Sequence, residues 1–135
     1  MKKIIILCLT GLIILGSIGV SALDKGTSKL LKDENFTGWF YDRNIKNWNY
    51  IRNGEIVKGD WVNDNNLYYL KDDGSMSKGW QQINNKWYYF SSIGIMKTGW
   101  LKDGSNWYYL NSDGTMAHDT NEGSYYLGSN GVWVQ

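Results

Sequence analysis

A repeat of about twenty residues restricts the fold of this 135-residue chain more than any other feature of its sequence. The segment "GWQQINNKWYYFSSIGIMKT" covers residues 79–98, and "GWLKDGSNWYYLNSDGTMAH" covers residues 99–118. Three residue types keep the same spacing outside this tandem pair: Gly54, Gly74, Gly94 and Gly114; Tyr68, Tyr88 and Tyr108; Met76, Met96 and Met116. The chain is therefore an array of small structural units. We divide it into a polar lead-in at 23–37, units at 38–58, 59–78, 79–98 and 99–118, and a capping unit at 119–135.

Each unit has the pattern of a β-hairpin followed by a connecting turn. In unit 79–98, "WQQI" and "WYYF" are short apolar runs on either side of the polar segment 84–86. The connecting turns contain Asn-Gly or Asp-Gly pairs, which accept a positive φ at low cost. A single hairpin is marginally stable in water and needs neighbours to cover its apolar face. The sequence therefore predicts an all-β solenoid of stacked hairpins.

Side chains alternate along a strand, so each hairpin presents two different faces. We assign one face to packing between units: Tyr68/Leu70, Tyr88/Phe90, Tyr108/Leu110 and Tyr125/Leu127. The second face then carries Trp87 and Tyr89, or Trp107 and Tyr109, together with Trp80 or Trp100 from the facing strand. Large aromatic rings that meet at a unit boundary form a cage.

The N-terminus has the pattern of a secretory signal peptide. Two lysines precede an apolar run at 4–20, and Val20-Ser21-Ala22 has the small-residue spacing of a cleavage site. We predict a signal peptide at 1–22, a secreted protein, and no membrane association after cleavage. A retained membrane anchor is the alternative, because about twenty apolar residues can span a bilayer. Cys8 lies inside the apolar run, so the mature chain contains no cysteine and no disulfide.

Charge and aromatic content restrict the class of ligand. Without Lys2 and Lys3 the 12 remaining basic residues are outnumbered by 13 acidic ones, which argues against nucleic-acid binding. The 8 tryptophans, 10 tyrosines and 3 phenylalanines all follow residue 22, and surplus tryptophan commonly marks a binding surface. Aromatic faces attract a weakly hydrated cation such as a quaternary ammonium, and methionine adds polarisable contact.

The units resemble the choline-binding, or cell-wall-binding, repeats of Gram-positive surface proteins and of phage or bacterial lysins. Gly79-Trp80, Trp87-Tyr88-Tyr89, Gly94 and Met96 match the repeat in one unit, and the next unit repeats the match through Met116. The resemblance implies a left-handed hairpin solenoid with ligand sites between successive hairpins. It also implies that the ligand is choline on cell-wall teichoic acids.

The resemblance also implies site residues. A site takes the Gly-Trp tryptophan and the first aromatic of Trp-Tyr-Tyr from one unit, and a tyrosine and a methionine from the next. Strand alternation favours the second tyrosine of each pair, and a bulge would reverse that choice. The two better sites are Trp80, Trp87, Tyr109 and Met116, and Trp100, Trp107, Tyr126 and Trp133. Two weaker sites are Trp61, Tyr89 and Met96, where Leu67 replaces an aromatic, and Trp39, Trp48, Tyr69 and Met76, where Asn49 replaces a tyrosine.

Other functions stay open to different degrees. The tryptophans could belong to a structural core alone, or they could bind cell-surface carbohydrate, as in the similar repeats of clostridial toxins and glucan-binding proteins. No catalytic set can be built around His118, the only histidine, so we predict no enzyme activity. The acidic residues Asp72, Asp73 and Asp103 occupy turn positions, so we assign no metal, and we assign no cofactor. A homodimer stays open.

Overall fold

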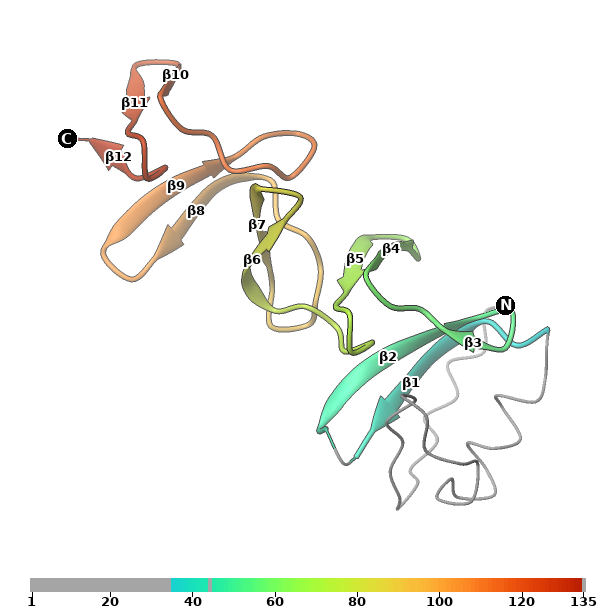
Figure 1. The fold of residues 1–135 in the computed structure, drawn as a ribbon. Coiled ribbons are helices and arrows are strands. Elements are labelled where there is room, and N and C mark those ends of the chain that lie inside the picture. Colours follow the sequence, from blue (N-terminus) through green and yellow to red (C-terminus); the bar gives the residue numbers. More distant parts are fainter. Residues whose placement is uncertain (1–34, 44, 135) are drawn as a thin grey trace. The chain divides into compact units, whose positions relative to one another are not determined.

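The structure, a computed structural model, describes residues 35–43 and 45–134 (Figure 1). The expected signal peptide, and the lead-in before residue 35, lie outside the described residues. Strands in chain order are β1 (Gly38–Asp42), β2 (Asn47–Arg52), β3 (Glu55–Ile56), β4 (Asp60–Asn63), β5 (Leu67–Leu70), β6 (Gly79–Ile83), β7 (Lys86–Phe90), β8 (Gly99–Asp103), β9 (Asn106–Leu110), β10 (Thr120–Glu122), β11 (Tyr125–Leu127) and β12 (Trp133–Val134). The described part of the chain contains no helix long and apolar enough to cross a membrane.

The strands form hairpins in chain order. Three sheets have two strands each, β4-β5, β6-β7 and β8-β9, while β1-β2-β3 and β10-β11-β12 have three. The chain divides into two compact units, the first containing described residues up to Asp64 and Tyr69–Met76, and the second containing residues 65–68 and 77–134. The prediction of an all-β chain of hairpins is therefore confirmed.

Short turns close the central hairpins. In β6-β7 the register runs from Gly79↔Phe90 to Ile83↔Lys86, so only Asn84 and Asn85 lie in the turn. Both have positive φ, 49° and 63°, as a type I′ turn requires. The β8-β9 register runs without a bulge from Gly99↔Leu110 to Asp103↔Asn106. Regular pairing keeps the side chains of each strand alternating between two faces.

A second, repeated turn leads from each hairpin to the next. The amide of Asn111 donates to the carbonyl of Thr115 at 2.8 Å, and Gly114 donates back to Asn111 at 2.8 Å. The same pair of bonds occurs in segments 71–75, 91–95 and 128–132. Gly114 has a φ of 85°, which favours glycine. The Asp113 carboxylate accepts hydrogen bonds from the hydroxyl and amide of Thr115, and these bonds lower the pKa of Asp113 below 3.8.

After this turn the chain bonds to the preceding hairpin. The amide of Met116 donates to the carbonyl of Trp87 at 2.7 Å, and Met96 donates to Leu67 at 2.9 Å. In the first unit Met76 donates to Trp48 at 2.8 Å. Within the second compact unit, the Met116 bond thus joins the segment that follows β8-β9 to the β6-β7 hairpin, as expected for stacked hairpins.

A buried side chain recurs at the same position of each repeat. Leu70, Phe90, Leu110 and Leu127, which end the second strand of successive hairpins, are at most 1% exposed. Methionine and glycine complete the packing, because a Cβ added at Gly131 would lie 2.5 Å from the sulfur of Met116. A Cβ at Gly114 would collide with Met96 in the same way. The leucine and phenylalanine positions are buried, as expected for the face assigned to packing between repeat units.

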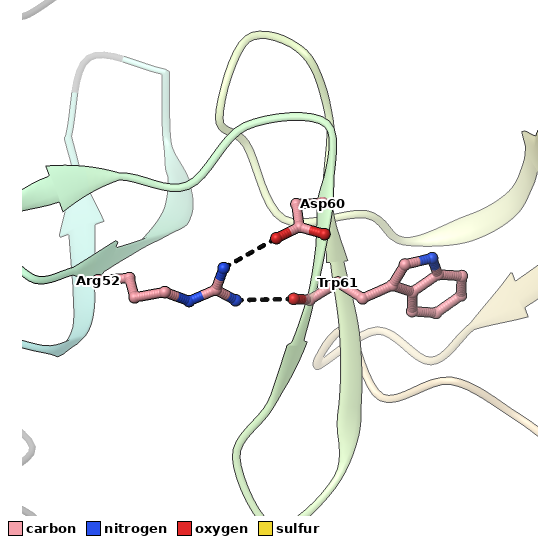
Figure 2. Close-up of polar contacts among 3 residues, drawn as sticks. All are labelled: Arg52, Asp60 and Trp61. Atoms are coloured by element: carbon pink, nitrogen blue, oxygen red, sulfur yellow. Dashed lines mark hydrogen bonds and ion pairs between the residues drawn. The ribbon is translucent and has the colours of Figure 1, made fainter.

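The first compact unit has contacts that differ from those of the later repeats. Asn49 is buried, and its amide donates to the carbonyl of Gly74 at 2.6 Å. Arg52, at the end of β2, donates to the Asp60 carboxylate at 2.8 Å and to the Trp61 carbonyl at 2.9 Å (Figure 2). The guanidinium lowers the pKa of Asp60. Arg52 therefore fixes the start of β4, which carries Trp61.

Candidate ligand-binding site

One face of the β6-β7 hairpin carries a group of aromatic rings. Trp80 lies opposite Tyr89 in the register, with ring centroids 5.2 Å apart. Trp87 lies diagonally across the same face, with its ring 6.5 Å from that of Trp80. These contacts confirm the expected grouping of Trp80, Trp87 and Tyr89 on one face.

The following hairpin adds a tyrosine and a carboxylate to this group. The ring of Tyr108, from β9, lies 4.8 Å from that of Trp80 at an interplanar angle of 66°. The Trp80 indole Nε1 donates to the Asp103 carboxylate at 2.9 Å. The group Trp80, Trp87 and Tyr108, the Trp80 cluster, is thus built by two successive hairpins.

The same arrangement recurs one hairpin later as a defined pocket. Trp100, Trp107, Tyr125 and Trp133 line a cavity of about 380 Å³, the Trp100 pocket. Trp100 lies 6.5 Å from Trp107 and 5.2 Å from Tyr125, and Tyr125 lies 5.1 Å from Trp133. The expected position of Trp133 beside this group is correct. The volume of the Trp100 pocket is in the range of small-molecule sites.

The structure differs from the sequence-based choice of tyrosine. We expected Tyr109 beside Trp80 and Tyr126 beside Trp100, but Tyr108 and Tyr125 make those contacts. Tyr109 instead packs on Trp100 of its own hairpin at 5.2 Å, and Tyr126 does not line the Trp100 pocket. The reason is the stacking direction, since the tryptophan-bearing face of one hairpin meets the opposite face of the next. No bulge is involved.

Met116 lies beside Trp87. Met116 bonds through its amide to Trp87, and its side chain packs on Gly131. Trp87 and Met116 also line a second cavity of about 380 Å³. Its remaining walls are largely polar: Asn85, Lys86, Asn111, Thr115, Ala117, His118 and Thr120. Met116 therefore lies beside Trp87 as expected, in contact with a neighbouring cavity.

The two weaker predicted sites are placed only in part. In the first unit Trp39 packs on Tyr50 at 4.9 Å, and Trp48 packs on Tyr41 at 5.5 Å. Tyr69 lies 5.2 Å from Trp61, and Met76 is only 4% exposed. The site expected from Trp61, Tyr89 and Met96 draws on both compact units and stays a prediction.

The Trp80 cluster and the Trp100 pocket have charged groups of opposite sign next to them. Asp103 contacts Trp80, whereas the ammonium of Lys102 lies 5.7 Å from the ring centroid of Trp107. Glu122 accepts a hydrogen bond from the Tyr109 hydroxyl, which raises the pKa of that tyrosine above 10.0. The walls of the Trp100 pocket itself are three indoles and a phenol.

This arrangement of aromatic rings suits a soft cation. Aromatic faces attract cations through their quadrupoles and exclude water from one side of a ligand. Among residues 35–43 and 45–134, no group of three or more histidine, cysteine, aspartate or glutamate side chains could hold a metal ion.

Comparison with known proteins identifies the family. Residues 77–121 match the model of the choline-binding repeat, and residues 60–76 match that of a putative cell wall binding repeat. The choline-binding domain of Spr1274 from Streptococcus pneumoniae is 41% identical, with a TM-score of 0.55 over 58% of this chain and 96% of that domain. The chain belongs to the choline-binding repeat family.

Two longer structures of the family are also similar. CbpF in complex with ipratropium matches with 40% identity and a TM-score of 0.67 over 74% of this chain and 32% of its own. CbpJ from Streptococcus pneumoniae matches with 40% identity and a TM-score of 0.66 over 73% and 34%. The chain thus spans about a third of the length of these two relatives. Comparison with curated proteins gives no match.

Sequence reasoning missed Tyr108, Tyr125 and Asp103. The first two stand beside the tyrosines that were chosen, so the missing information was the stacking direction. A signal for Asp103 exists in hindsight, since Asp64 lies at the same end of its hairpin and accepts a hydrogen bond from Trp39 at 3.2 Å.

Proposed function

We propose that this choline-binding repeat protein binds choline on cell-wall teichoic acids and performs no catalysis. The observation that carries the proposal is the Trp100 pocket, where three indoles and a phenol surround a ligand-sized cavity. A quaternary ammonium has no hydrogen-bond donor to satisfy, so rings alone can replace its weak hydration. The Trp80 cluster supplies a second site of similar composition.

The residues proposed for choline differ from the sequence-based sets by their tyrosines. They are Trp100, Trp107, Tyr125 and Trp133 in one site and Trp80, Trp87 and Tyr108 in the other. Met116 supports Trp87 through the backbone bond to its carbonyl. A protein that attaches to the wall must be exported, so the proposal includes secretion and a cell-surface location.

Binding through two sites at once would make attachment to the wall tighter than binding at either site alone. One exposed aromatic cage supplies a dissociation constant near the millimolar range, about 4 kcal/mol. Two sites in one compact unit that engage the same polymer gain on the order of 10²-fold without any new contact. Attachment to walls should therefore be much tighter than binding of free choline.

A choline titration followed by tryptophan fluorescence and thermal melting tests the ligand. We expect saturable quenching and a rise in the melting midpoint, because a ligand that binds only the folded state stabilises it. Tyr125→Ala should weaken choline binding at the Trp100 pocket. Tyr126→Ala is the matched control, because Tyr126 is similarly exposed but does not line the pocket.

The same titration with neutral sugars tests the alternative ligand class. Monosaccharides and glucan fragments at tens of millimolar should leave the fluorescence and the melting midpoint unchanged. Stabilisation by these sugars without stabilisation by choline would replace the proposal with carbohydrate binding.

A further inference from the structure

The cavity that Trp87 and Met116 line together has walls unlike those of the Trp100 pocket. We call it the polar cavity, since its apolar walls are one indole, a methionine and an alanine. The remaining walls carry amides, hydroxyls, an ammonium and an imidazole. They come from the turn and second strand of β6-β7, from the segment after β9 and from the start of β10. All of these segments belong to the second compact unit.

The polar cavity offers hydrogen-bond donors and acceptors together. The Asn111 side chain uses its nitrogen to donate to the Thr115 hydroxyl at 3.0 Å, so its carbonyl oxygen remains as an acceptor. His118 directs Nδ1 to the Asp119 carboxylate at 2.9 Å, which leaves Nε2 for a ligand. The other polar walls add an amide, a hydroxyl and an ammonium: Asn85, Thr120 and Lys86.

This set of groups argues against a charged ligand. The Lys86 ammonium repels a cation, and a single indole does not form a cage around one. An anion needs donors around it, whereas Asn111 presents a carbonyl oxygen. Lys86 also interacts with the Asp113 carboxylate. The His118 imidazole likewise has a carboxylate neighbour, so neither basic side chain is left to attract an anion alone.

A sugar ring fits these walls. A pyranose has a face of C–H groups that packs on an indole, and each of its hydroxyls both donates and accepts hydrogen bonds. Trp87 supplies the indole, with 42% of its surface exposed, and the polar walls supply partners for the hydroxyls. The cavity volume of about 380 Å³ is in the range of small-molecule sites.

Trp87 joins the polar cavity to the Trp80 cluster. Its indole is a member of the cluster, 6.5 Å from that of Trp80, and is also a wall of the cavity. The backbone bond from Met116 to Trp87 connects the segment after β9 to the same residue. A ligand with its cation in the cluster and a sugar next to that cation therefore reaches the cavity across one indole.

We propose that the polar cavity binds a neutral sugar of the polymer that carries the choline. The Trp80 cluster and the polar cavity then recognise a choline-substituted saccharide together. This inference rests on the proposed function, since it assumes that the Trp80 cluster binds choline.

A free sugar should bind the polar cavity too weakly to detect at tens of millimolar. One indole face and a few solvent-exposed hydrogen bonds scarcely exceed the free-energy cost of immobilising a small ligand. When choline in the Trp80 cluster already holds the saccharide in place, most of that cost is no longer incurred. The sugar contacts then add to the affinity.

Two choline esters that differ only in the group on the phosphate test the inference. One is the methyl ester of phosphocholine, and the other is phosphocholine joined to O6 of methyl glucoside. NMR titrations of the full chain follow the indole N–H signals of Trp80 and Trp100, which report the two sites separately. We expect the glucoside to bind the Trp80 cluster more tightly than the methyl ester by roughly three- to tenfold, the range of one or two net hydrogen bonds. The Trp100 pocket, which contains none of the polar walls, should bind both esters equally.

A third ester separates hydrogen bonding from simple contact with the indole. Phosphocholine joined to cyclohexylmethanol carries a ring of the same size without hydroxyls. It should gain less affinity than the glucoside at the Trp80 cluster. An equal or larger gain would overturn recognition of a sugar by the polar walls.

Variants of the polar walls locate the sugar. Thr120→Val removes a hydroxyl and keeps a β-branched side chain in β10. It should weaken binding of the glucoside by roughly two- to fivefold and leave the methyl ester unaffected. His118→Leu should act in the same way. Thr98→Val is the matched control, because Thr98 is exposed and lines neither cavity.

The outcomes distinguish this inference from the proposed function. If the Trp80 signal responds to none of the esters, choline binding fails at this cluster and the inference fails with it. If the glucoside and the methyl ester bind with equal affinity, choline binding stands and sugar recognition is wrong. If Thr120→Val and His118→Leu bind the glucoside as tightly as Thr98→Val does, the sugar does not occupy the polar cavity.

Discussion

Gly114→Ala should destabilise the second compact unit. The contact of this glycine with Met96 sets part of the loss in unfolding free energy. Two costs combine at this position. The φ of 85° costs an alanine about 1 to 2 kcal/mol. A Cβ would lie 3.0 Å from Cγ of Met96 and closer still to its sulfur and methyl, so the methionine must move at a cost of about 1 kcal/mol. Reduced freedom of the unfolded chain offsets about 0.5 kcal/mol.

The net loss is about 2 kcal/mol of unfolding free energy. In a unit of this size, that loss lowers the melting midpoint by roughly 8 to 16 °C. Gly104→Ala is the matched control, because Gly104 also has a positive φ, 59°, but a Cβ there would meet nothing within 4 Å. This control should lose about 1 kcal/mol less than Gly114→Ala.

A double-mutant cycle assigns the difference. In a Met96→Ala background, Gly114→Ala should cost no more than Gly104→Ala does. Chemical unfolding monitored by tryptophan fluorescence measures the four proteins of the cycle and the Gly104→Ala control. Equal losses for Gly114→Ala and Gly104→Ala in the parent protein would refute the steric part of this reasoning.

Three further predictions concern the site and the turns. Tyr108→Ala should weaken choline binding at the Trp80 cluster by about tenfold, as loss of one cation–π wall implies, whereas Tyr109→Ala should act mainly on stability; titration calorimetry and thermal melting distinguish the two. Trp107→Ala should leave choline binding at the Trp80 cluster measurable but greatly reduce sedimentation with walls, and undiminished sedimentation would contradict the multivalent mechanism. Asp73 and Asp113 have lowered pKa values through their bonds to Ser75 and Thr115, so their stabilising effect is present above pH 3.8 and is lost as the pH falls below it; Asp113→Asn should make the melting midpoint less sensitive to acid over that range.

Much of the fold could be predicted from local chemistry. The turn at Asn84 and Asn85 and the positive φ of Gly114 follow from residues that accept this backbone conformation. The burial of Phe90 and Leu110 follows from strand alternation within a hairpin. Each of these features depends on residues close together in the sequence.

The candidate site could be predicted only in part, because it lies between hairpins. Alternation places Trp107 and Tyr109 on one face and Tyr108 on the other, but it contains no information about which face meets the preceding hairpin. The bond from Asp103 to Trp80 and the contact of Tyr108 with Trp80 depend on that packing as well as on the register. These contacts needed the three-dimensional structure.

The bonds from each methionine amide to the preceding hairpin have a consequence for how the chain assembles. Met76, Met96 and Met116 each reach a carbonyl 28 or 29 residues earlier, so every link closes a loop of nearly the same length. Loop-closure entropy depends on that length and not on the number of units already present. Adding a unit therefore leaves the mean separation of contacting residues unchanged, and its ratio to chain length falls. An array of this kind can gain hairpins by duplication, or lose them by deletion, without becoming slower to fold.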